Sequence, residues 1–265
     1  DVLTSMPSPH SPPAPGNNRL MTRLLVKLGL VALCVSAFIA SPFVTFLGEF
    51  GGDFQYGLAV YARNVIELTD FLNAIAEKFT DVFFHKSFSI RISLTRFSRH
   101  YLYPQLPRTA LTSQLTKTPI EIDALDHKIL NTLSEHPQNS HREIAEKIRV
   151  PFSTVHTRIA ALQRTGVIGG TTYFIDTNKL GYHMFEILIF AKGLNPALRD
   201  QLYTYAHTAT HTTYFVHCIG EWDFEIGLEV ADPLDANSFV QKNRTSSRDQ
   251  NLFPEVKQGL KRFRF

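Results

Sequence analysis

With 265 residues, the chain is long enough for two or three small domains. Its charged fraction of 19% is ordinary and its formal net charge of +3 is mild, so charge alone does not define a partner. The two cysteines, Cys34 and Cys218, lie in apolar runs, which excludes a disulfide framework and favours a reducing compartment.

The chain opens with a segment rich in proline and serine, Asp1 to Asn18, which predicts a disordered tail over residues 1–20. An apolar stretch over residues 24–47 follows, and it has more than one interpretation. Leu28 to Leu47 is nearly free of charge and has the length of a membrane span. The basic residues before it, within Met21 to Lys27, also give it the outline of a signal peptide.

We favour the alternative, a buried helix from about Leu24 to Ala40 followed by a strand from Phe43 to Leu47. Pro42 breaks the apolar run at the point where such a helix would end. A helix and a strand are also the elements that an internal repeat of the chain requires at this place.

The repeat consists of two segments of eight residues. Asp53 to Val60 matches Asp223 to Val230 at five of the eight positions, and in both cases a glycine-bearing turn precedes and a helical stretch follows. After the first copy, apolar residues at helical spacing from Val65 to Phe79 predict a helix, and Phe88 to Leu94 predicts a strand. Residues 21–103 are therefore predicted to be a partial copy of the domain at the other end of the chain, without its first strand.

Residues 104–120 are predicted to be a linker because they contain prolines and threonines and show little periodicity. Three short apolar stripes at helical spacing come next, starting at Ile122, Ile144 and Val155. A three-helix unit this small closes one core only if its helices cross steeply, as in a helix-turn-helix.

The local signals agree with three helices and a wing. Ser140 to Glu143 has the composition of a capping box at the start of the second helix. Gly166 ends the third helix, and Thr171 to Ile175 is expected to be the strand that follows.

The third helix carries the side chains that we expect to meet DNA. With its apolar stripe inward, Ser153, Thr157 and Arg164 point outward, and no acidic residue lies between Val150 and Thr165. Short polar side chains and arginines suit base edges and phosphates. Arg158 lies nearer the edge of this face and is expected to contact a phosphate. The predicted DNA-binding residues are Ser140, His141, Ser153, Thr154, His156, Thr157, Arg158 and Arg164. The alternative is a solvated helix face in a module that contacts proteins.

The motif keeps a specific spacing along the chain, Leu125-Asp126-x-x-Ile129-Leu130, then Ser140-x-x-Glu143-Ile144-Ala145, then Val150-x-x-Ser153-Thr154-Val155-x-x-Arg158-Ile159-x-x-Leu162-x-x-x-Gly166-Val167-Ile168. This pattern resembles the Lrp/AsnC family of transcription regulators. The resemblance implies a winged helix-turn-helix, over residues 121–178 here, and a second domain that dimerises and senses an effector. Pro151 departs from the family, which usually has serine there, so the third helix lacks its usual hydroxyl cap.

Residues 179–265 show the matching order of elements. We expect a buried strand, a helix, two strands, a polar helical region and a last strand, at Met184 to Ala191, Asn195 to His207, Thr213 to Ile219, Trp222 to Val230, Asp235 to Asn251 and Val256 to Phe263. This βαββαβ order is ferredoxin-like. The predicted fold class is therefore α+β, a winged helix-turn-helix linked to a ferredoxin-like domain and preceded by a partial ferredoxin-like repeat.

The resemblance implies an effector site at the turn between the two middle strands, often for an amino acid. The predicted effector-binding residues here are Gly220, Trp222 and Asp223. Gly220 allows the tight backbone, and the carboxylate of Asp223 could accept a hydrogen bond from an ammonium group. The alternative is that Gly220 and Asp223 only form a hairpin turn.

No catalytic residue, cofactor or metal site is expected. The sequence contains no phosphate-cradling glycine loop, nucleophile elbow or paired zinc cysteines. The best metal candidates, His207, His211, His217 and Cys218, are poorly arranged. The helix ends near His207, and neighbours on a strand such as His217 and Cys218 point to opposite faces.

Together these patterns predict a cytoplasmic, sequence-specific DNA-binding transcription regulator that is not an enzyme. We expect a homodimer or a larger homo-oligomer, double-stranded DNA as the partner, an amino-acid-like effector, and no membrane, since an export signal is out of place before a DNA-reading module. Two alternatives stay open. One is a membrane-tethered regulator or sensor, and the other is a small-molecule-binding protein whose helix-turn-helix mediates protein contacts.

Overall fold

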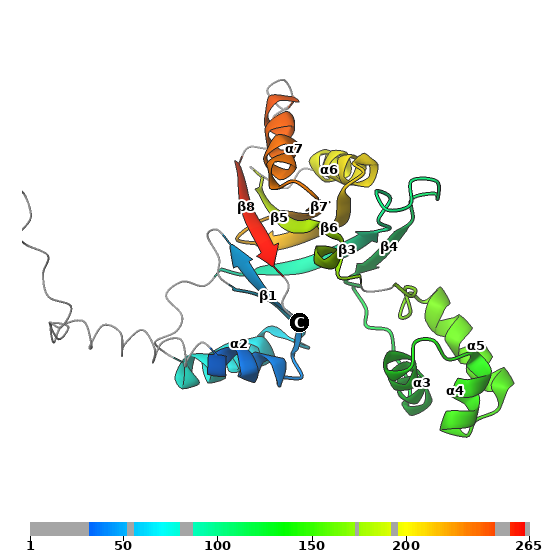
Figure 1. Ribbon diagram of the computed structural model, residues 1–265. Coiled ribbons are helices and arrows are strands. Elements are labelled where there is room, and N and C mark those ends of the chain that lie inside the picture. The colour runs from blue at the N-terminus through cyan, green and yellow to red at the C-terminus, as the bar shows by residue number, and fades with distance from the viewer. Residues whose placement is uncertain are drawn as a thin grey trace, which may run out of the picture. The chain divides into compact units, whose positions relative to one another are not determined.

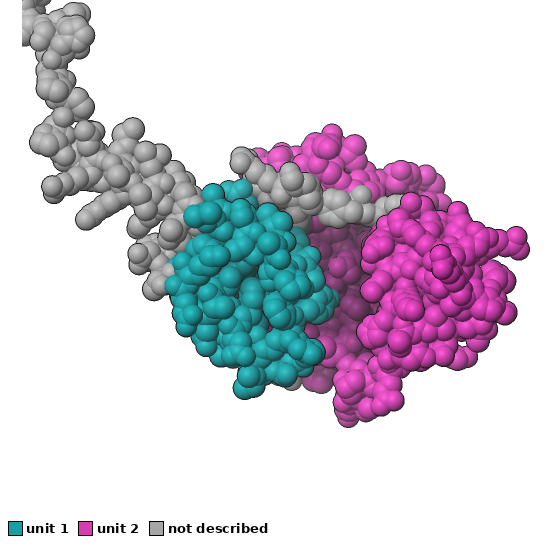
Figure 2. Space-filling view, turned by 90° about the horizontal axis from the view of Figure 1, so that it is seen from below, with its two compact units in different colours: residues 1–49, 55–87, 263–265 teal, residues 50–54, 88–262 magenta. Residues whose placement is uncertain are grey.

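The computed structural model describes residues 32–51, 56–79, 87–172, 175–191, 196–246 and 255–262. The chain divides into two compact units (Figure 2). Unit 1 contains residues 1–49, 55–87 and 263–265, and unit 2 contains residues 50–54 and 88–262. The expected tail and the start of the apolar stretch, through residue 31, lie outside the described residues.

Unit 1 consists of a helical stretch, a β-hairpin and a second helix. Residues 32–39 are helical, and β1 (Val44–Gly51) pairs antiparallel with β2 (Tyr56–Val60). Helix α2 (Val65–Lys78) follows, and its first turn is capped by the side chain of Asn64, which accepts from the backbone amide of Glu67 at 2.9 Å. The buried side chains of this unit include Cys34, Phe38, Phe71 and Phe79.

The apolar stretch that allowed several interpretations is therefore divided between two elements. Its described part is a helix in which Cys34 and Phe38 are buried while Leu33 and Ile39 are exposed, a turn, and the strand β1. The choice of a buried helix over the other interpretations stays a prediction. Among the residues that the structure describes, none of the helices combines the length and the apolar character that crossing a bilayer requires.

Unit 2 contains a six-stranded antiparallel sheet (Figure 1). Its strands are β3 (Ser89–Phe97), β4 (Ala110–Gln114), β5 (His183–Phe190), β6 (Thr212–Gly220), β7 (Phe224–Val230) and β8 (Glu255–Arg262). They are arranged in the order β8-β5-β7-β6-β3-β4. Helices α6 (Pro196–Thr208) and α7 (Pro233–Ser246) cover one face. The part from β5 to β8 has the predicted ferredoxin-like βαββαβ order.

The core of this domain lies between the sheet and the two helices. Ile187, Ile189 and Ile226 are almost fully buried from the sheet side, and Leu202 and Ala236 are buried from α6 and α7. Alternate residues of a strand point to opposite faces, so the aliphatic positions of β5 that face the helices stabilise the domain by burial.

Strand β7 differs from its expected pattern. The sequence predicts one apolar and one polar face, yet all seven residues of β7 are buried, including Glu225 and Glu229. A buried carboxylate is tolerated only when it is paired and hydrogen bonded. The partners of Glu229 include Arg99 and Tyr101, which the sequence predicts to belong to the partial repeat over residues 21–103.

The segment before the helix-turn-helix extends the C-terminal sheet. Strand β3 pairs with β6 from Ser89↔Gly220 to Arg96↔Tyr214, and β4 pairs with β3. The prediction of a linker over residues 104–120 is wrong at β4, whose short, polar and mostly exposed sequence carries no strand signal. The strand predicted at Phe88 to Leu94 exists, but it belongs to unit 2 and pairs within it. The partial ferredoxin-like repeat thus stays a prediction, and Asp53 to Gln55 of its matching segment lie outside the described residues.

The connection between β3 and β4 supplies the partners of Glu229. Arg99 binds both oxygens of that fully buried carboxylate, at 2.8 Å from Nε and 3.0 Å from Nη2. The hydroxyl of Tyr101 donates to the same carboxylate, and the hydroxyl of Thr177 donates to it at 3.2 Å. Burial and the hydrogen bond to Glu229 raise the pKa of Tyr101, so its phenol stays a donor.

A second arginine of this connection, Arg108, binds the end of α6. It donates to the carbonyl oxygens of Ala209 at 2.5 Å and Thr212 at 2.6 Å, and its guanidinium lies 4.8 Å from the ring centroid of Phe97. A cation is favourable where the carbonyls of a helix end without intrahelical partners. The β3–β4 segment is therefore an integral part of the folded domain.

We predict that Arg99→Met lowers the free energy of unfolding by about 3–5 kcal/mol, because it leaves a buried carboxylate without its counter-charge. Urea-induced unfolding measures this loss. The double variant Arg99→Met/Glu229→Leu should recover part of it, since no unpaired charge then remains. Arg63→Met, which breaks an ion pair with an arginine side chain 88% exposed, is the matched control and should have little effect. Equal losses for Arg99→Met and Arg63→Met would contradict the assignment.

Candidate nucleic-acid interface

The helix-turn-helix forms its own small core. Helices α3 (Ala124–Glu135), α4 (His141–Ile148) and α5 (Phe152–Arg164) occupy the three segments with apolar stripes. The side chains that these stripes bury together are Ile129, Ile144, Ala145, Val155, Ile159 and Leu162. The periodicity of the sequence thus fixes which side of α5 faces inward.

Capping boxes start the first two helices. At α4, the Ser140 hydroxyl accepts from the backbone amide of Glu143 at 3.3 Å, and the Glu143 carboxylate accepts from the Ser140 amide at 2.6 Å. The hydroxyl of Ser140 also donates to that carboxylate at 2.7 Å, and these bonds lower the pKa of Glu143. The predicted capping box is confirmed. Ser140, predicted to bind DNA, uses its hydroxyl in this cap.

The turn between α4 and α5 has an unusual backbone. Arg149 adopts the left-handed conformation with φ 57°, where glycine or asparagine is the usual residue. Pro151 is the N-cap of α5, and it makes no side-chain hydrogen bond there, as its departure from the usual serine predicts. Its carbonyl accepts instead from the amides of Thr154 and Val155. Helix α5 therefore starts without a hydroxyl cap and depends on other contacts for its position.

One of those contacts is made by Arg158. Its Nη1 lies 2.8 Å from a carboxylate oxygen of Asp123 and 3.3 Å from one of Asp126, the two residues of the α3 capping box. The hydrogen bond from the Asp126 amide, together with the Arg158 charge, lowers the pKa of Asp123, so this carboxylate stays charged as the pH falls below its ordinary pKa. Arg158 joins the middle of α5 to the start of α3. Its predicted phosphate contact stays a prediction.

The outward side of α5 presents the remaining predicted residues. Ser153, His156, Thr157 and Arg164 are exposed, and Thr154 is half-buried. Among the described residues, no ion pair involves Arg164. The face that these side chains form contains hydroxyls, an imidazole and a guanidinium and no carboxylate, which suits base edges and phosphates.

His141 and His156 meet between the two helices. Their Nδ1 atoms are 3.1 Å apart, and their ring centroids are 5.3 Å apart. Phe152, the first residue of α5, stacks on His156 with ring centroids 5.8 Å apart and planes inclined by 23°. The sequence predicts both histidines as site residues but gives no signal that they contact each other.

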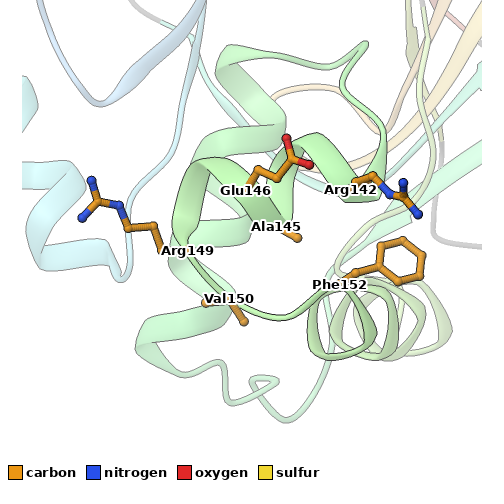
Figure 3. A pocket seen from close by; sticks show the side chains of 6 residues that line it. All are labelled: Arg142, Ala145, Glu146, Arg149, Val150 and Phe152. Atoms are coloured by element: carbon orange, nitrogen blue, oxygen red, sulfur yellow. The ribbon is translucent and has the colours of Figure 1, made fainter.

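A shallow hollow lies beside this contact, at the turn of the motif (Figure 3). It is lined by Arg142, Ala145, Glu146, Arg149, Val150 and Phe152. Figure 3 shows the side chains of Arg149 and Phe152 directed away from each other from the two ends of the turn. Phe152 and the two arginines are not among the predicted site residues. The signal in the sequence is an aromatic residue that falls outside the inward stripe of α5, and Phe152 is 49% exposed.

The wing differs from its expected form. Thr171, Thr172 and Ile175 are not in a strand, and Tyr173 and Phe174 lie outside the described residues. The 3₁₀ helix η1 (Thr177–Leu180) comes next, so the strand predicted over Thr171 to Ile175 is wrong for its described residues. Gly166 ends α5 as predicted, with a positive φ of 78°.

The predicted effector turn joins β6 to β7. Gly220 has φ 150°, and a Cβ at this position would lie 2.6 Å from the carbonyl oxygen of Phe88, so only glycine fits there. The Asp223 carboxylate accepts from the Ala191 amide at 2.7 Å, and Trp222 Nε1 donates to Glu225 at 2.9 Å. The three residues thus hold the turn in place. One oxygen of Asp223 is already engaged.

The candidate metal ligands make other contacts. His207 stacks on Tyr203, the Nδ1 of His211 is 2.9 Å from the carbonyl oxygen of Glu229, and His217 stacks on Phe224. Burial raises the pKa of the Cys218 thiol. In the described part of the chain, no three histidine, cysteine or carboxylate side chains gather as metal ligands would.

Known proteins resemble parts of this chain, including the helix-turn-helix. A family model described as winged helix-turn-helix DNA-binding matches residues 122–168. An uncharacterised HTH-type transcriptional regulator of Pyrococcus furiosus is 36% identical over 122 residues, which are 46% of this chain and 81% of that protein. The regulatory protein AsnC of Haemophilus influenzae is 39% identical over 61 residues, 23% of this chain and 41% of that protein. A solved structure of an AsnC family transcriptional regulator from Agrobacterium tumefaciens aligns with a TM-score of 0.44 and 18% identity, over 54% of this chain and 92% of that one.

We predict that Arg158→Ala destabilises the helix-turn-helix by roughly 1 kcal/mol, because it removes the partner of the buried Asp126 carboxylate. Thermal unfolding followed by circular dichroism measures this effect. Arg164→Ala removes the same charge from the exposed side of α5 and should leave stability unchanged within about 0.5 kcal/mol. The ion pair has no such role if the two variants unfold at the same temperature.

Proposed function

This chain belongs to the Lrp/AsnC family of DNA-binding transcription regulators, and we propose that it reads a specific operator with α5 under the control of an amino-acid-like effector. This follows from the HTH-type transcriptional regulator of Pyrococcus furiosus, 81% of whose length this chain covers at 36% identity, together with the match to AsnC and to the winged helix-turn-helix model. We propose in addition that the chain binds a specific operator and an effector through the residues named below. A DNA-binding regulator acts where the DNA is, so we place the protein in the cytoplasm, without an enzymatic activity.

The observation that carries the DNA proposal is the outward face of α5. Ser153, Thr157 and Arg164 project from a helix whose opposite side is buried and whose middle is held by Arg158. A helix of this kind enters the major groove with its polar side against the base edges. Thr157 and Arg164 are the residues that we expect to contact bases, and His141 and Thr154 lie at the border of this face.

The proposal includes a homodimer or a larger homo-oligomer. Two copies of α5 then contact half-sites about one helical turn of DNA apart, so the operator is expected to be a pseudo-palindrome. An effector acts on such an assembly by favouring the arrangement of the copies that fits the half-sites, or the one that does not.

The effector proposal is supported by the charges around the β6–β7 turn. Burial and the charge of Arg199 lower the pKa of His217, while the charge of Asp223 opposes them, and Arg199 is paired with Asp200 at 2.8 Å. The Asp223 carboxylate has one oxygen engaged with the Ala191 amide, and a carboxylate suits the ammonium group of an amino acid. We propose that Asp223 accepts from the ammonium group, with Gly220 and Trp222 shaping the turn.

The DNA proposal is tested by selection from random DNA followed by gel-shift titration. Arg164→Ala and Thr157→Ala should each weaken binding of the selected operator by about 1–3 kcal/mol and relax its sequence at one position. Arg63→Ala, which removes the same charge from unit 1, should bind as the unaltered chain does. If no sequence is enriched, or if both α5 variants bind unchanged, α5 does not read DNA.

The effector proposal predicts that one or a few amino acids raise the melting temperature of the chain, because a ligand that binds only the folded state stabilises it. Asp223→Asn retains an acceptor for the Ala191 amide but loses the charge. This variant should fold normally and lose the ligand-induced shift, which differential scanning fluorimetry with the free amino acids measures. A shift of the same size in Asp223→Asn would exclude Asp223 as the ammonium site.

A further inference from the structure

The contact between His141 and His156 is a hydrogen bond with a strict requirement. An imidazole Nδ1 either carries a proton or accepts one, so two Nδ1 atoms at 3.1 Å bond only if one proton lies between them. If both nitrogens were bare, two lone pairs would face each other. If both were protonated, two N–H groups would face each other. The pair therefore holds one proton on its inner side.

This requirement decides what the outer nitrogens present. In the neutral pair, the histidine that donates from Nδ1 has a bare Nε2, and its partner has a protonated Nε2. One further proton binds at the bare Nε2 and leaves the inner hydrogen bond intact. The pair then carries one positive charge and two outward N–H donors. A second further proton would have to go to the inner side and break the contact.

The pair lies where DNA is expected. His141 is the first residue of α4, and His156 is exposed on α5 between the neighbours Ser153 and Thr157. Phe152 stacks on one side of His156 and restricts its ring. Phosphate oxygens and the N7 and O6 atoms of guanine are acceptors, so DNA favours the form of the pair with two outward donors and a positive charge.

The charged side chains near the histidine pair are engaged in other contacts or exposed to solvent. On α4, Glu143 is engaged in the cap with Ser140, and Arg142 and Glu146 line the hollow beside Phe152 with Arg149, while Lys147 is exposed. On α5, Arg158 is engaged with Asp123 and Asp126 of the α3 capping box, and Arg164 is exposed in the last turn.

We propose that His141 and His156 act as one unit that takes up one proton, at the bare outer Nε2, when α5 binds DNA. His156 is the specificity-determining residue: in the neutral pair its Nδ1–H donates to His141, and its bare Nε2 takes up the proton and donates it in a hydrogen bond to an acceptor on the DNA. His141 is the positioning residue, whose Nδ1 accepts from His156 and fixes its tautomer and orientation. The inference rests on the proposed DNA-binding function and adds that DNA binding is coupled to the uptake of one proton.

The test is the dissociation constant of the full chain for its selected operator between pH 6 and pH 8, at constant ionic strength. The affinity should rise as the pH falls, by up to about tenfold per pH unit for each chain bound, which is the slope for one proton taken up. His141→Gln and His156→Gln should each remove this pH dependence, and the double variant should remove no more than either one. His127→Gln, a substitution of an exposed histidine on α3, should keep it.

The proposal is wrong if the affinity of the unaltered chain does not change with pH. It is also wrong if the two single variants have effects on the pH dependence that add in the double variant, or if His127→Gln loses the pH dependence as well. Ring-nitrogen NMR of the free, unaltered chain gives a second measurement that no variant's folding affects, and it should show one protonated and one bare Nδ1 in the neutral pair. A chain that selects no operator at any pH fails the proposed function itself, whereas a chain that binds its operator without pH dependence fails only the proton-sharing pair.

Discussion

The bond between Arg99 and Glu229 is the contact on which the architecture of unit 2 depends. Its two partners are separated by the whole helix-turn-helix, and the carboxylate is fully buried while the arginine side chain is 20% exposed. A buried carboxylate without a cation is costly, so the C-terminal domain requires the segment that precedes the DNA-binding motif. Arg108 acts in the same sense at the end of α6. The C-terminal domain is therefore built from segments that lie on both sides of the helix-turn-helix in the sequence.

The sequence predicts those parts of the fold that depend on local patterns of residues. The stripes of α3, α4 and α5, the capping box at Ser140 and the order from β5 to β8 all depend on neighbours within one element. The pairing of β3 with β6 depends on residues more than a hundred positions apart, and the polar strand β4 carries no alternation. A local pattern contains no information on such partners, which is why residues 104–120 are predicted to be a linker.

In the candidate interface, too, the sequence predicts the local features and not the contacts between helices. Helical periodicity predicts which residues of α5 point outward, and Ser153, Thr157 and Arg164 are exposed. It does not predict what an outward side chain touches. Arg158 bonds to Asp126, 32 positions earlier, and His156 bonds to His141, 15 positions earlier, through contacts that only the crossing of the helices creates. The direction of a side chain thus depends on one helix, whereas the residues that it contacts depend on how the three helices pack.

The place of the helix-turn-helix between β4 and β5 has a mechanical consequence. A domain at the end of a chain hangs from one tether, but this one is attached at both ends to strands of the same sheet. Two anchor points restrict the rotation and reach of the motif more than one would, because both connections must meet the same sheet at once. Strands β4 and β5 are four positions apart in the order of the sheet, so the two attachment points of the motif lie on strands that are not neighbours. A rotation of the helix-turn-helix must therefore be accommodated by both connections at once, whereas a single connection would leave it free to turn.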